Sequence, residues 1–460
     1  MAERSVSDSD SFELFVPGRV ALLGEHSDWA AGFREHSGYC LVTGTEQGLY
    51  ARVRRLSDRK ALVLRSVDES GVAASTWLDL EDPTALLALA QAGGFWSYAA
   101  GVAYQIVVTN EVGGLEVDNY RTTLPLRKGL SSSAALCVLV ARAFSKAYKL
   151  KYTIRGEMEL AYRGEIATPS KCGRMDQCCA FGSTPVFMTF DGDHLFCEPL
   201  GLPRGAVFHY VIVDLLAKKD TTEILAALRQ AYTFSPTSSE DPARRLIEEG
   251  VVRFLGPTNK RLLLAAREAF LAGDAEKIGA IMKEYQSLFD SQVGPACPNQ
   301  LTAPVLHKCI EWPSLQPLIW GAKGIGSQGD GAAQFLCRSR EAQVHVGPGR
   351  VLRVGHSSGQ HEFLIGPLLF VFFSLDRSDA HRQGGALDDT NGAHSHGAKM
   401  TGGFRLSRFI LSTKPSFLRV LGRPLGSGEA KEPRGSRAIR RRGLSYLQCP
   451  KVARSARLRM

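Results

Sequence analysis

The polar side chains that could do chemistry are concentrated first in residues 16–29 of this 460-residue chain. The segment holds a guanidinium, an imidazole and two carboxylates near the end of an apolar run. Carboxylates and imidazole accept and donate hydrogen bonds in fixed directions, which suits the hydroxyl groups of a polyol. Solvated charges at an exposed hairpin end would give the same spacing, and the spacing alone favours that interpretation. The four candidates are Arg19, Glu25, His26 and Asp28.

Two further acids lie in residues 164–177, where Glu165 and Asp176 stand on either side of Pro169. Transfer of a phosphoryl group needs an acceptor for the hydroxyl proton and a carboxylate for the metal ion. Glu165 and Asp176 can divide these two roles if the fold brings them together. Two acids at this separation are weak evidence by themselves.

A phosphate-binding segment is predicted at residues 125–135, which have the sequence PLRKGLSSSAA. A glycine and small hydroxyl residues at the start of a helix leave several backbone N–H groups for an anion, and the helix dipole adds positive charge there. Serine hydroxyls can also coordinate a magnesium ion that bridges phosphates. The segment lacks the GxxxxGK pattern of a Walker A loop. A plain serine-capped helix would give the same pattern, so both interpretations stay open for this segment alone.

A glycine-rich segment occurs later in the chain. Residues 321–331 contain five glycines and precede the apolar pair Phe335 and Leu336. Such a loop allows a backbone to approach a ligand closely, although a flexible linker has the same composition.

The elements that must position these residues follow from hydrophobic periodicity. Residues 131–150 place apolar side chains on one face of a predicted helix, and residues 206–216 form an apolar run typical of a buried strand. Strands followed by packed helices predict an α+β protein, with a domain boundary near residue 204. The other expected elements are strands at 12–16, 20–23 and 48–53, a strand pair at 114–124, a helix at 158–165, and helices over 221–289.

The composition is that of a globular protein, with 44% hydrophobic and 22% charged residues. No apolar run approaches the roughly 20 residues that a membrane-spanning helix needs. The first 15 residues are polar and acidic where a secretory signal would be apolar, so a cytoplasmic location is predicted. Ten cysteines without matched CxxC pairs favour reduced thiols over a thiolate metal site.

The net charge of +10 belongs to the end of the chain. Residues 401–460 hold 15 Lys or Arg against two Asp or Glu, whereas residues 1–400 hold 41 against 44. The body of the protein therefore lacks electrostatic support for nucleic-acid binding. Residues 343–460 are rich in Gly, Ser, Arg and His, which predicts a mostly disordered tail. A nonspecific role of this basic tail on nucleic acid or a membrane surface stays open.

Together and in this order, the four segments resemble the GHMP kinase superfamily, which includes galactokinase, homoserine kinase, mevalonate kinase and phosphomevalonate kinase. The similarity covers roughly residues 12–340. Residues 16–29 are most similar to the galactokinase segment in which PGR is followed by an apolar run and GEH. Residues 125–135 match the PxxxGLSSSAA phosphate loop, and residues 172–177 resemble the galactokinase segment CGxMDQ.

The resemblance implies a two-domain GHMP kinase fold with the site between the domains. Residues 1–204 would form an ATP-binding domain like ribosomal protein S5 domain 2. Residues 205–342 would form a C-terminal domain with a ferredoxin-like core, which looks incomplete because no closing helix and strand are evident. Residues 343–460 would then be the basic tail.

The resemblance also implies a role for each candidate. Asp176 would act as the base, or as the electrostatic orienter, for the acceptor hydroxyl, with Arg19 beside it to favour the alkoxide. The mechanism would rely on positioning and charge neutralisation, without a covalent intermediate. Mg²⁺ would be held by Ser132, Ser133 and Glu165. The sugar would be bound by Arg19, Glu25, His26, Asp28 and Asp176, and ATP by Lys128, Gly129, Leu130, Ser131, Ser132, Ser133 and Ala134.

Departures from the galactokinase pattern keep the acceptor open. Arg127 and Lys128 replace the usual glycines, and residues 29–32 (WAAG) replace the usual Tyr-Asn-x-Gly. The predicted activity is ATP-dependent phosphorylation of a hydroxyl on a monosaccharide or a similar small polyol. The alternatives are a mevalonate-type kinase and a non-catalytic, ligand-sensing relative, although a pure binding protein has no need of Asp176 as a base.

Overall fold

The computed structural model describes residues 11–33, 35–67, 72–124, 130–170, 172–233 and 241–346, with short strands at 353–354, 363–364 and 370–375. The chain divides into two compact units, residues 1–389 and 390–460, and every described residue lies in the first. Lys128 and Gly129, and most of the predicted tail, lie outside the described residues. Within the described part of the chain, no helix has the length and apolarity to cross a membrane.

A seven-stranded sheet dominates the first half of the described chain, with β2 as its longest strand. Along one edge β2 pairs antiparallel with β1. Its other edge is shared by β5, which pairs with residues 49–56, and by β6, which pairs with residues 38–42. β3 pairs parallel with β5, and β4 and β7 lie at the two ends of the strand order. The strands are β1 (Ser11–Leu23), β2 (Gly38–Leu56), β3 (Ala61–Val67), β4 (Ala73–Asp79), β5 (Gly114–Thr122), β6 (Val186–Asp191) and β7 (His194–Pro199).

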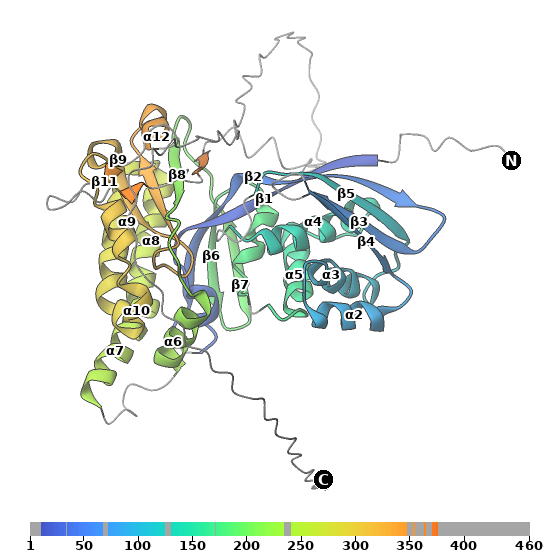
Figure 1. Ribbon diagram of the computed structural model, residues 1–460, viewed down its shortest axis with the longest axis horizontal. Helices are drawn as coiled ribbons and strands as arrows, with labels where there is room; N and C mark the ends of the chain where they lie inside the picture. Colours follow the sequence, from blue (N-terminus) through green and yellow to red (C-terminus); the bar gives the residue numbers. More distant parts are fainter. Residues whose placement is uncertain are drawn as a thin grey trace, which may run out of the picture. The chain divides into compact units, whose positions relative to one another are not determined.

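Four helices gather on one face of this sheet (Figure 1). The helix predicted over residues 131–150 is confirmed as α4, and its apolar stripe is buried. A Cβ at Gly101 of α3 would collide with the main chain of Gly164 in α5, so glycines allow these two helices to pack closely. The bounds are α2 (Pro83–Ala92), α3 (Ser97–Val107), α4 (Ser132–Ala147) and α5 (Ile154–Ile166), and the short segments α1 (Ser27–Ala30) and η2 (Asp176–Phe181) lie beside them.

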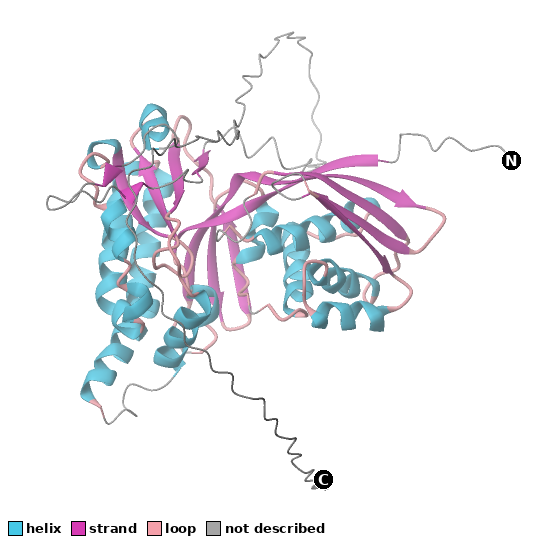
Figure 2. Cartoon of the chain, in the orientation of Figure 1, coloured by secondary structure: helices cyan, strands magenta, loops and turns pink. Residues whose placement is uncertain are grey.

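A second, antiparallel sheet has the strand order β13-β8-β10-β9. Along the chain, helices separate β8 from β9, whereas α12, β11 and β12 lie between β10 and β13. The ferredoxin-like core stays a prediction. Figure 2 shows this sheet beside a layer of long helices. The strands are β8 (Phe208–Asp214), β9 (Ile319–Gly324), β10 (Ala332–Cys337) and β13 (Phe370–Leu375), and β11 (Arg353–Val354) pairs with β12 (Phe363–Leu364). The helices are α6 (Thr221–Thr233), α7 (Pro242–Arg253), η4 (Phe254–Thr258), α8 (Asn259–Ala272), α9 (Ala275–Gln292), η5 (Gly294–Ala296), α10 (Pro298–Leu301), α11 (Pro304–Ile310), η6 (Gln316–Leu318) and α12 (Arg340–Val346).

Two strand predictions are wrong for identifiable reasons. The two strands expected around Pro17 and Gly18 form one continuous β1, because β1 lies at an edge and a register shift at this point accommodates the proline. The strand pair expected at 114–124 is the single strand β5. Its turn-like residue Asn119 is fully buried and contacts the hydroxyl groups of Ser66 and Thr122.

Closing elements follow β10, where the sequence shows none clearly. The short helix α12 begins at Arg340, and the side chain of Gln343 donates to the main-chain oxygen of Tyr210 in β8 at 2.8 Å. The strand β13 then pairs with β8. The domain boundaries at 204 and 342 stay predictions, and the first falls in the loop between β7 and β8.

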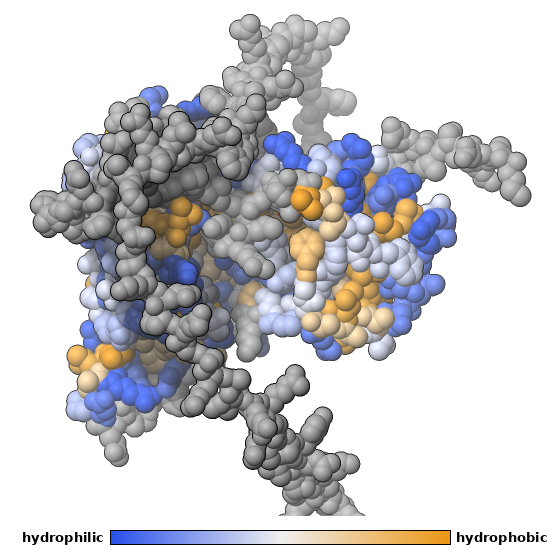
Figure 3. All heavy atoms as spheres, in the orientation of Figure 1, coloured by the Kyte–Doolittle hydropathy of each residue, from blue (hydrophilic) through white to orange (hydrophobic). Residues whose placement is uncertain are grey.

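Buried contacts join the larger sheet to the helices of the second half. Asn259, at the start of α8, is fully buried and donates to Oγ of Ser27 and to the main-chain oxygen of Tyr39, both at 3.1 Å. Its side-chain oxygen accepts from the Tyr39 N–H at 3.0 Å. These bonds fix Ser27 and Tyr39 against α8, and Phe289 and Leu262 belong to the same apolar core. On the face drawn in Figure 3, hydrophobic patches alternate with hydrophilic surface, as on ordinary globular proteins.

Candidate functional site

Arg19 is placed by a close approach between β1 and the end of the predicted phosphate loop. A Cβ at Gly18 would lie 2.9 Å from the main-chain oxygen of Leu130 and would collide with Leu124, so only glycine fits. The backbone N–H of Arg19 donates to that same Leu130 oxygen at 3.1 Å. The Pro-Gly-Arg sequence therefore holds a buried arginine beside the start of α4.

Arg19, Ser131 and Asp176 meet at one carboxylate oxygen. Nε of Arg19 donates to Oδ1 of Asp176 at 3.0 Å, and its Nη2 forms an ion pair with the same oxygen. The hydroxyl of Ser131 donates to this Oδ1 at 3.1 Å. Burial opposes the charge of Arg19, but the Asp176 carboxylate raises its pKa above the ordinary value. Because Oδ1 accepts these bonds, Oδ2 is the oxygen left for a ligand.

The N-terminus of α4 has no side-chain cap. Ser131 is the N-cap residue, yet its hydroxyl bonds to Asp176, and its backbone is left-handed with φ 56°. The first N–H groups of a helix have no partner inside the helix, so those of Ser132, Ser133 and Ala134 stay available to an anion. A left-handed non-glycine residue costs about 1–3 kcal/mol, and such strain concentrates at functional sites.

Glu165, near the end of α5, faces the same helix start. Its Oε1 accepts from the Ser133 hydroxyl at 2.7 Å, and its Oε2 accepts from Nε2 of Gln177 at 2.8 Å. Burial, together with the negative charge of Asp176, raises the pKa of Glu165 to about 7. A cation beside this carboxylate would offset the cost of burying its charge.

The oxygen donors at this point suit a magnesium ion that arrives with a phosphate ligand. Mg²⁺ prefers oxygen, keeps several waters, and is commonly held by one or two carboxylates together with substrate phosphates. Glu165 and the hydroxyl of Ser133 supply two such oxygens in contact, with Ser132 adjacent in the chain. No group of three His, Cys, Asp or Glu that could hold a metal without a substrate occurs among the residues that the structure describes.

Asp28 brings a second carboxylate to the Arg19–Asp176 pair. Burial and the charge of Asp176 raise the pKa of Asp28 to about 6, and Arg19 opposes this rise. The position of Asp28 depends on Gly173, because a Cβ at residue 173 would collide with its Oδ2. Two carboxylates therefore lie close to one guanidinium, with backbone from the CGRMDQ segment packed against them.

Glu25 is engaged by a residue that sequence reasoning missed. It forms a fully buried ion pair with Lys323 of β9, whose ammonium also donates to the Gly324 oxygen at 2.7 Å. The ring of Tyr285 lies 5.3 Å from that ammonium, so the pair has an aromatic neighbour. The sequence offered one signal, a single lysine in the otherwise uncharged strand β9. The structure therefore gives Glu25 a protein partner, and its predicted sugar-binding role stays a prediction.

His26 is a neutral, buried donor in this structure. The indole Nε1 of Trp29 donates to its Nδ1 at 3.2 Å, which places the ring proton on Nε2. That Nε2 lies beside the main chain of Ser327 without a hydrogen bond of normal geometry. Burial, and then the positive charge of Lys219, lowers the pKa of His26 to about 3. An acceptor hydroxyl could take this unsatisfied N–H.

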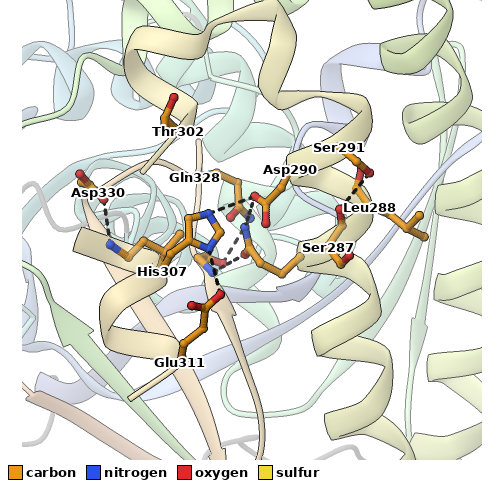
Figure 4. A network of polar contacts seen from close by, with 12 residues as sticks. Ser287, Leu288, Asp290, Ser291, Thr302, His307, Glu311, Gln328 and Asp330 are labelled. Atoms are coloured by element: carbon orange, nitrogen blue, oxygen red, sulfur yellow. Dashed lines mark hydrogen bonds and ion pairs between the residues drawn. The ribbon is translucent and has the colours of Figure 1, made fainter. Parts of the chain in front are cut away.

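The glycine-rich segment is a structured turn between β9 and β10. Gly324 donates to Oε1 of Gln286 in α9 at 2.8 Å, and Oδ1 of Asp330 accepts from the Leu306 N–H at 2.8 Å. Gly326 and Gly329 have positive φ, 66° and 72°, which favours glycine at both positions. Figure 4 shows the polar network that supports this turn, including His307 between carboxylates.

The structure thus gathers residues from three separate segments of the chain, residues 16–29, 125–135 and 164–177. Arg19, Ser131 and Asp176 are in direct contact, Asp28 lies beside them, and Ser133 contacts Glu165. Leu130 and Ala134 are buried and shape the loop, so they would contribute backbone groups only. Sequence reasoning also missed Gln177, whose amide orients Glu165. The arrangement can hold a phosphate at a helix start and a hydroxyl next to Asp176.

The comparisons with known proteins agree with this geometry. Residues 97–183 match the family described as GHMP kinases N terminal domain. The chain is 29% identical over 287 residues to a galactokinase of Thermococcus kodakarensis, covering 59% of this chain and 75% of that protein. It is 26% identical over 289 residues to a galactokinase of Pyrococcus furiosus, covering 58% and 74%.

Solved structures share the fold at low identity. A galactokinase of Lactococcus lactis complexed with galactose matches with a TM-score of 0.53 and 20% identity, over 73% of this chain and 89% of that chain. A mevalonate kinase of Methanococcus jannaschii matches with a TM-score of 0.52 and 14% identity, over 74% and 94%. The α+β prediction and the predicted resemblance to galactokinases and other GHMP kinases are confirmed.

Proposed function

We propose that the chain transfers the γ-phosphoryl group of ATP to a hydroxyl of a monosaccharide or a similar small polyol. Its match to the GHMP kinases N terminal domain family over residues 97–183 and its similarity to galactokinases support this proposal. The observation that carries this proposal is the contact of Arg19 and Ser131 with Asp176 at the uncapped start of α4. A phosphate donor and a hydroxyl acceptor can meet there.

In the proposed reaction, Oδ2 of Asp176 accepts a hydrogen bond from the reacting hydroxyl. Arg19 fixes the carboxylate through Oδ1 and places a positive charge beside the oxygen that becomes the nucleophile. Positioning and charge stabilisation of this kind supply most of the catalysis in phosphoryl transfer. The new bond joins the acceptor oxygen to phosphorus, the bond to the ADP oxygen breaks, and the hydroxyl proton leaves toward Asp176.

The donor phosphates would bind the backbone N–H groups at the start of α4. Ser132, Ser133 and Ala134 present them, and the predicted role of Lys128 and Gly129 in binding ATP stays a proposal. Glu165 and the serine hydroxyls would hold Mg²⁺, which neutralises phosphate charge when bound. Gln177 keeps Glu165 oriented toward that position.

The acceptor side would use Asp28 and the Nε2–H of His26. Both lie on the segment that joins β1 to β2, and Asp28 lies close to Arg19 and Asp176. The mevalonate-type and ligand-sensing alternatives share this fold, so the acceptor and turnover must be tested directly. A cytoplasmic location is likewise a proposal.

The test is Mg²⁺-dependent ADP release from the full chain with a panel of monosaccharides, uronic acids, mevalonate and homoserine. Turnover on one acceptor, lost in Asp176→Asn, is the expected result. Normal folding and ATP binding without release of ADP on any acceptor would favour the ligand-sensing alternative. Turnover that survives in Asp176→Asn would exclude the role given to that carboxylate.

A further inference from the structure

Three cations, Lys219, Lys323 and Arg229, lie close enough to His26 to disfavour its protonation. Lys323 is paired with Glu25, but Lys219 and Arg229 have no carboxylate partner among the residues that the structure describes. Lys219 donates to the main-chain oxygen of Gln328 at 3.0 Å, which leaves its charge uncompensated. The region therefore carries more positive than negative charge.

Arg229 is held in place without an acceptor. Its guanidinium carbon lies 5.6 Å from the ring centroid of Trp29, and its Nε is shielded from solvent and forms no hydrogen bond. Trp29 in turn bonds to His26 and packs edge-on against Tyr232 of α6, with 5.8 Å between ring centroids. An aromatic neighbour orients Arg229, while its Nε has no hydrogen-bond partner within the part of the chain that the structure describes.

Lys219 is fixed from the other side by the glycine-rich turn. The carbon atoms of its side chain occupy the space that a Cβ at Gly331 would need. Next to it, the hydroxyls of Thr221 and Ser327 are 3.1 Å apart, which joins the start of α6 to the same turn. The ammonium is thus held near His26 by packing and by a main-chain oxygen.

Unpaired cations in partly buried positions are costly unless a ligand neutralises them. Burial lowers the pKa of Lys219 to about 8, so the amine is still largely protonated near neutral pH. Glu25, the acid whose charge acts on Lys219, is already paired with Lys323. The positive charge of Lys219 and Arg229 is therefore available to a bound anion.

We propose that the acceptor carries an acidic group, a carboxylate or a phosphate monoester, which Arg229 and Lys219 bind while its hydroxyl meets Asp176. This inference rests on the proposed function, because it assigns the acceptor of the same site. The two ends of the acceptor would be distinguished by charge: Asp28 and Asp176 are the acids beside Arg19, whereas Lys219 and Arg229 are the cations near His26. A neutral sugar would leave both cations unpaired.

The experiment compares matched acceptors on the full chain with Mg²⁺ and ATP: a hexose, the corresponding uronic acid, the corresponding hexose monophosphate, and mevalonate. The expected result is a kcat/KM at least about tenfold higher for an acidic acceptor than for the neutral sugar. Arg229→Gln and Lys219→Gln should each raise KM for that acid about 10- to 100-fold, the usual effect of losing a hydrogen bond to a charged group, with kcat changed much less. The acid with the higher kcat/KM shows whether the acidic group of the acceptor is a carboxylate or a phosphate.

Matched controls remove a cation without touching this region. Lys218→Gln changes the exposed neighbour of Lys219, and Arg261→Gln removes an exposed arginine paired with Glu284 in α9. Both should keep wild-type KM. Arg229→Lys keeps the charge and should recover part of the affinity for the acid, which a purely structural role of Arg229 would not predict.

Thermal stabilisation by each acceptor is measured in parallel, so that binding is tested apart from turnover. This inference would be overturned if the protein preferred the neutral sugar, or if Arg229→Gln weakened the binding of neutral and acidic acceptors equally. Either result would leave the kinase proposal standing. Stabilisation by an acid that disappears in Arg229→Gln, without turnover on any acceptor, would support the binding assignment and refute the kinase proposal. Absence of any acid-specific stabilisation and turnover would refute the acidic acceptor.

Discussion

Replacing Glu165 with glutamine should stabilise the protein in the absence of ligands and abolish its proposed activity. The Glu165 carboxylate is buried, and burial with the nearby Asp176 charge raises its pKa to about 7 from an ordinary 4.5. Glutamine keeps the shape, and its amide can still bond to Ser133 and Gln177. The substitution therefore removes a charge that the folded protein accommodates poorly.

The magnitude follows from the difference between the two pKa values. Each pKa unit corresponds to about 1.4 kcal/mol, so an ionised Glu165 costs the folded state about 3 kcal/mol above pH 7. Below about pH 4.5 the residue is protonated in both the folded and the unfolded protein, and the cost vanishes. Between these values the folded state holds a proton that the unfolded state has released, so wild-type stability falls as the pH rises.

Thermal or urea unfolding of the wild type and Glu165→Gln between pH 4 and pH 9 measures this difference. The variant should be nearly equal to the wild type at the acid end and more stable by up to about 3 kcal/mol above pH 7. Mg²⁺ with ATP should reverse the order, because a bound cation favours the ionised carboxylate. A variant that is less stable at pH 8, or a difference that does not change with pH, would refute the reasoning.

Three further substitutions test individual contacts. Lys323→Met should lower the free energy of unfolding in urea by about 3–5 kcal/mol, because it leaves the buried Glu25 without its partner. The double substitution with Glu25→Gln should recover much of this loss, and no recovery would contradict the pairing. His307→Gln should destabilise the protein below about pH 6.5 and have no effect at high pH, because its carboxylate neighbour raises the pKa of His307; an equal cost at pH 9 would exclude this origin. Gly173→Ala should lower kcat/KM at least about tenfold by displacing Asp28, with little loss of stability, whereas Gly32→Ala has open space and should behave as the wild type.

The sequence predicted which candidate residues lie together better than it predicted the local backbone. Glycines and charged residues at close spacing pointed to Arg19, Ser131, Glu165 and Asp176. The structure brings Arg19 and Ser131 into contact with Asp176, and it pairs Glu165 with Ser133. Such residues are informative because a buried charge needs a partner, so few structures accommodate several of these residues in one protein. That Ser131 bonds to Asp176 and leaves the helix start uncapped was not predictable, since serine at that position ordinarily caps the helix.

Contacts between residues far apart in the chain were the main features that the sequence did not predict. Lys323 and Glu25 are separated by about three hundred residues, and no local pattern indicates that a strand lysine meets a carboxylate across the fold. The cations at residues 219 and 229 were missed for a related reason. Arg229 lies in α6 and Lys219 in the loop before it, where charged residues ordinarily face solvent. The strand β1 continues through Pro17 because β1 lies at an edge of the sheet. That position is a property of the whole sheet, so the local sequence does not reveal it.

The most direct test of the account is the transfer of a labelled γ-phosphate from ATP to the acceptor, followed in the wild type and in Asp176→Asn with Mg²⁺ present. The account predicts a phosphorylated acceptor with the wild type and a loss of at least about a hundredfold with the variant, which still folds and binds ATP. A labelled product formed equally well by Asp176→Asn, or no product on any acceptor from a folded, ATP-binding wild type, would contradict it.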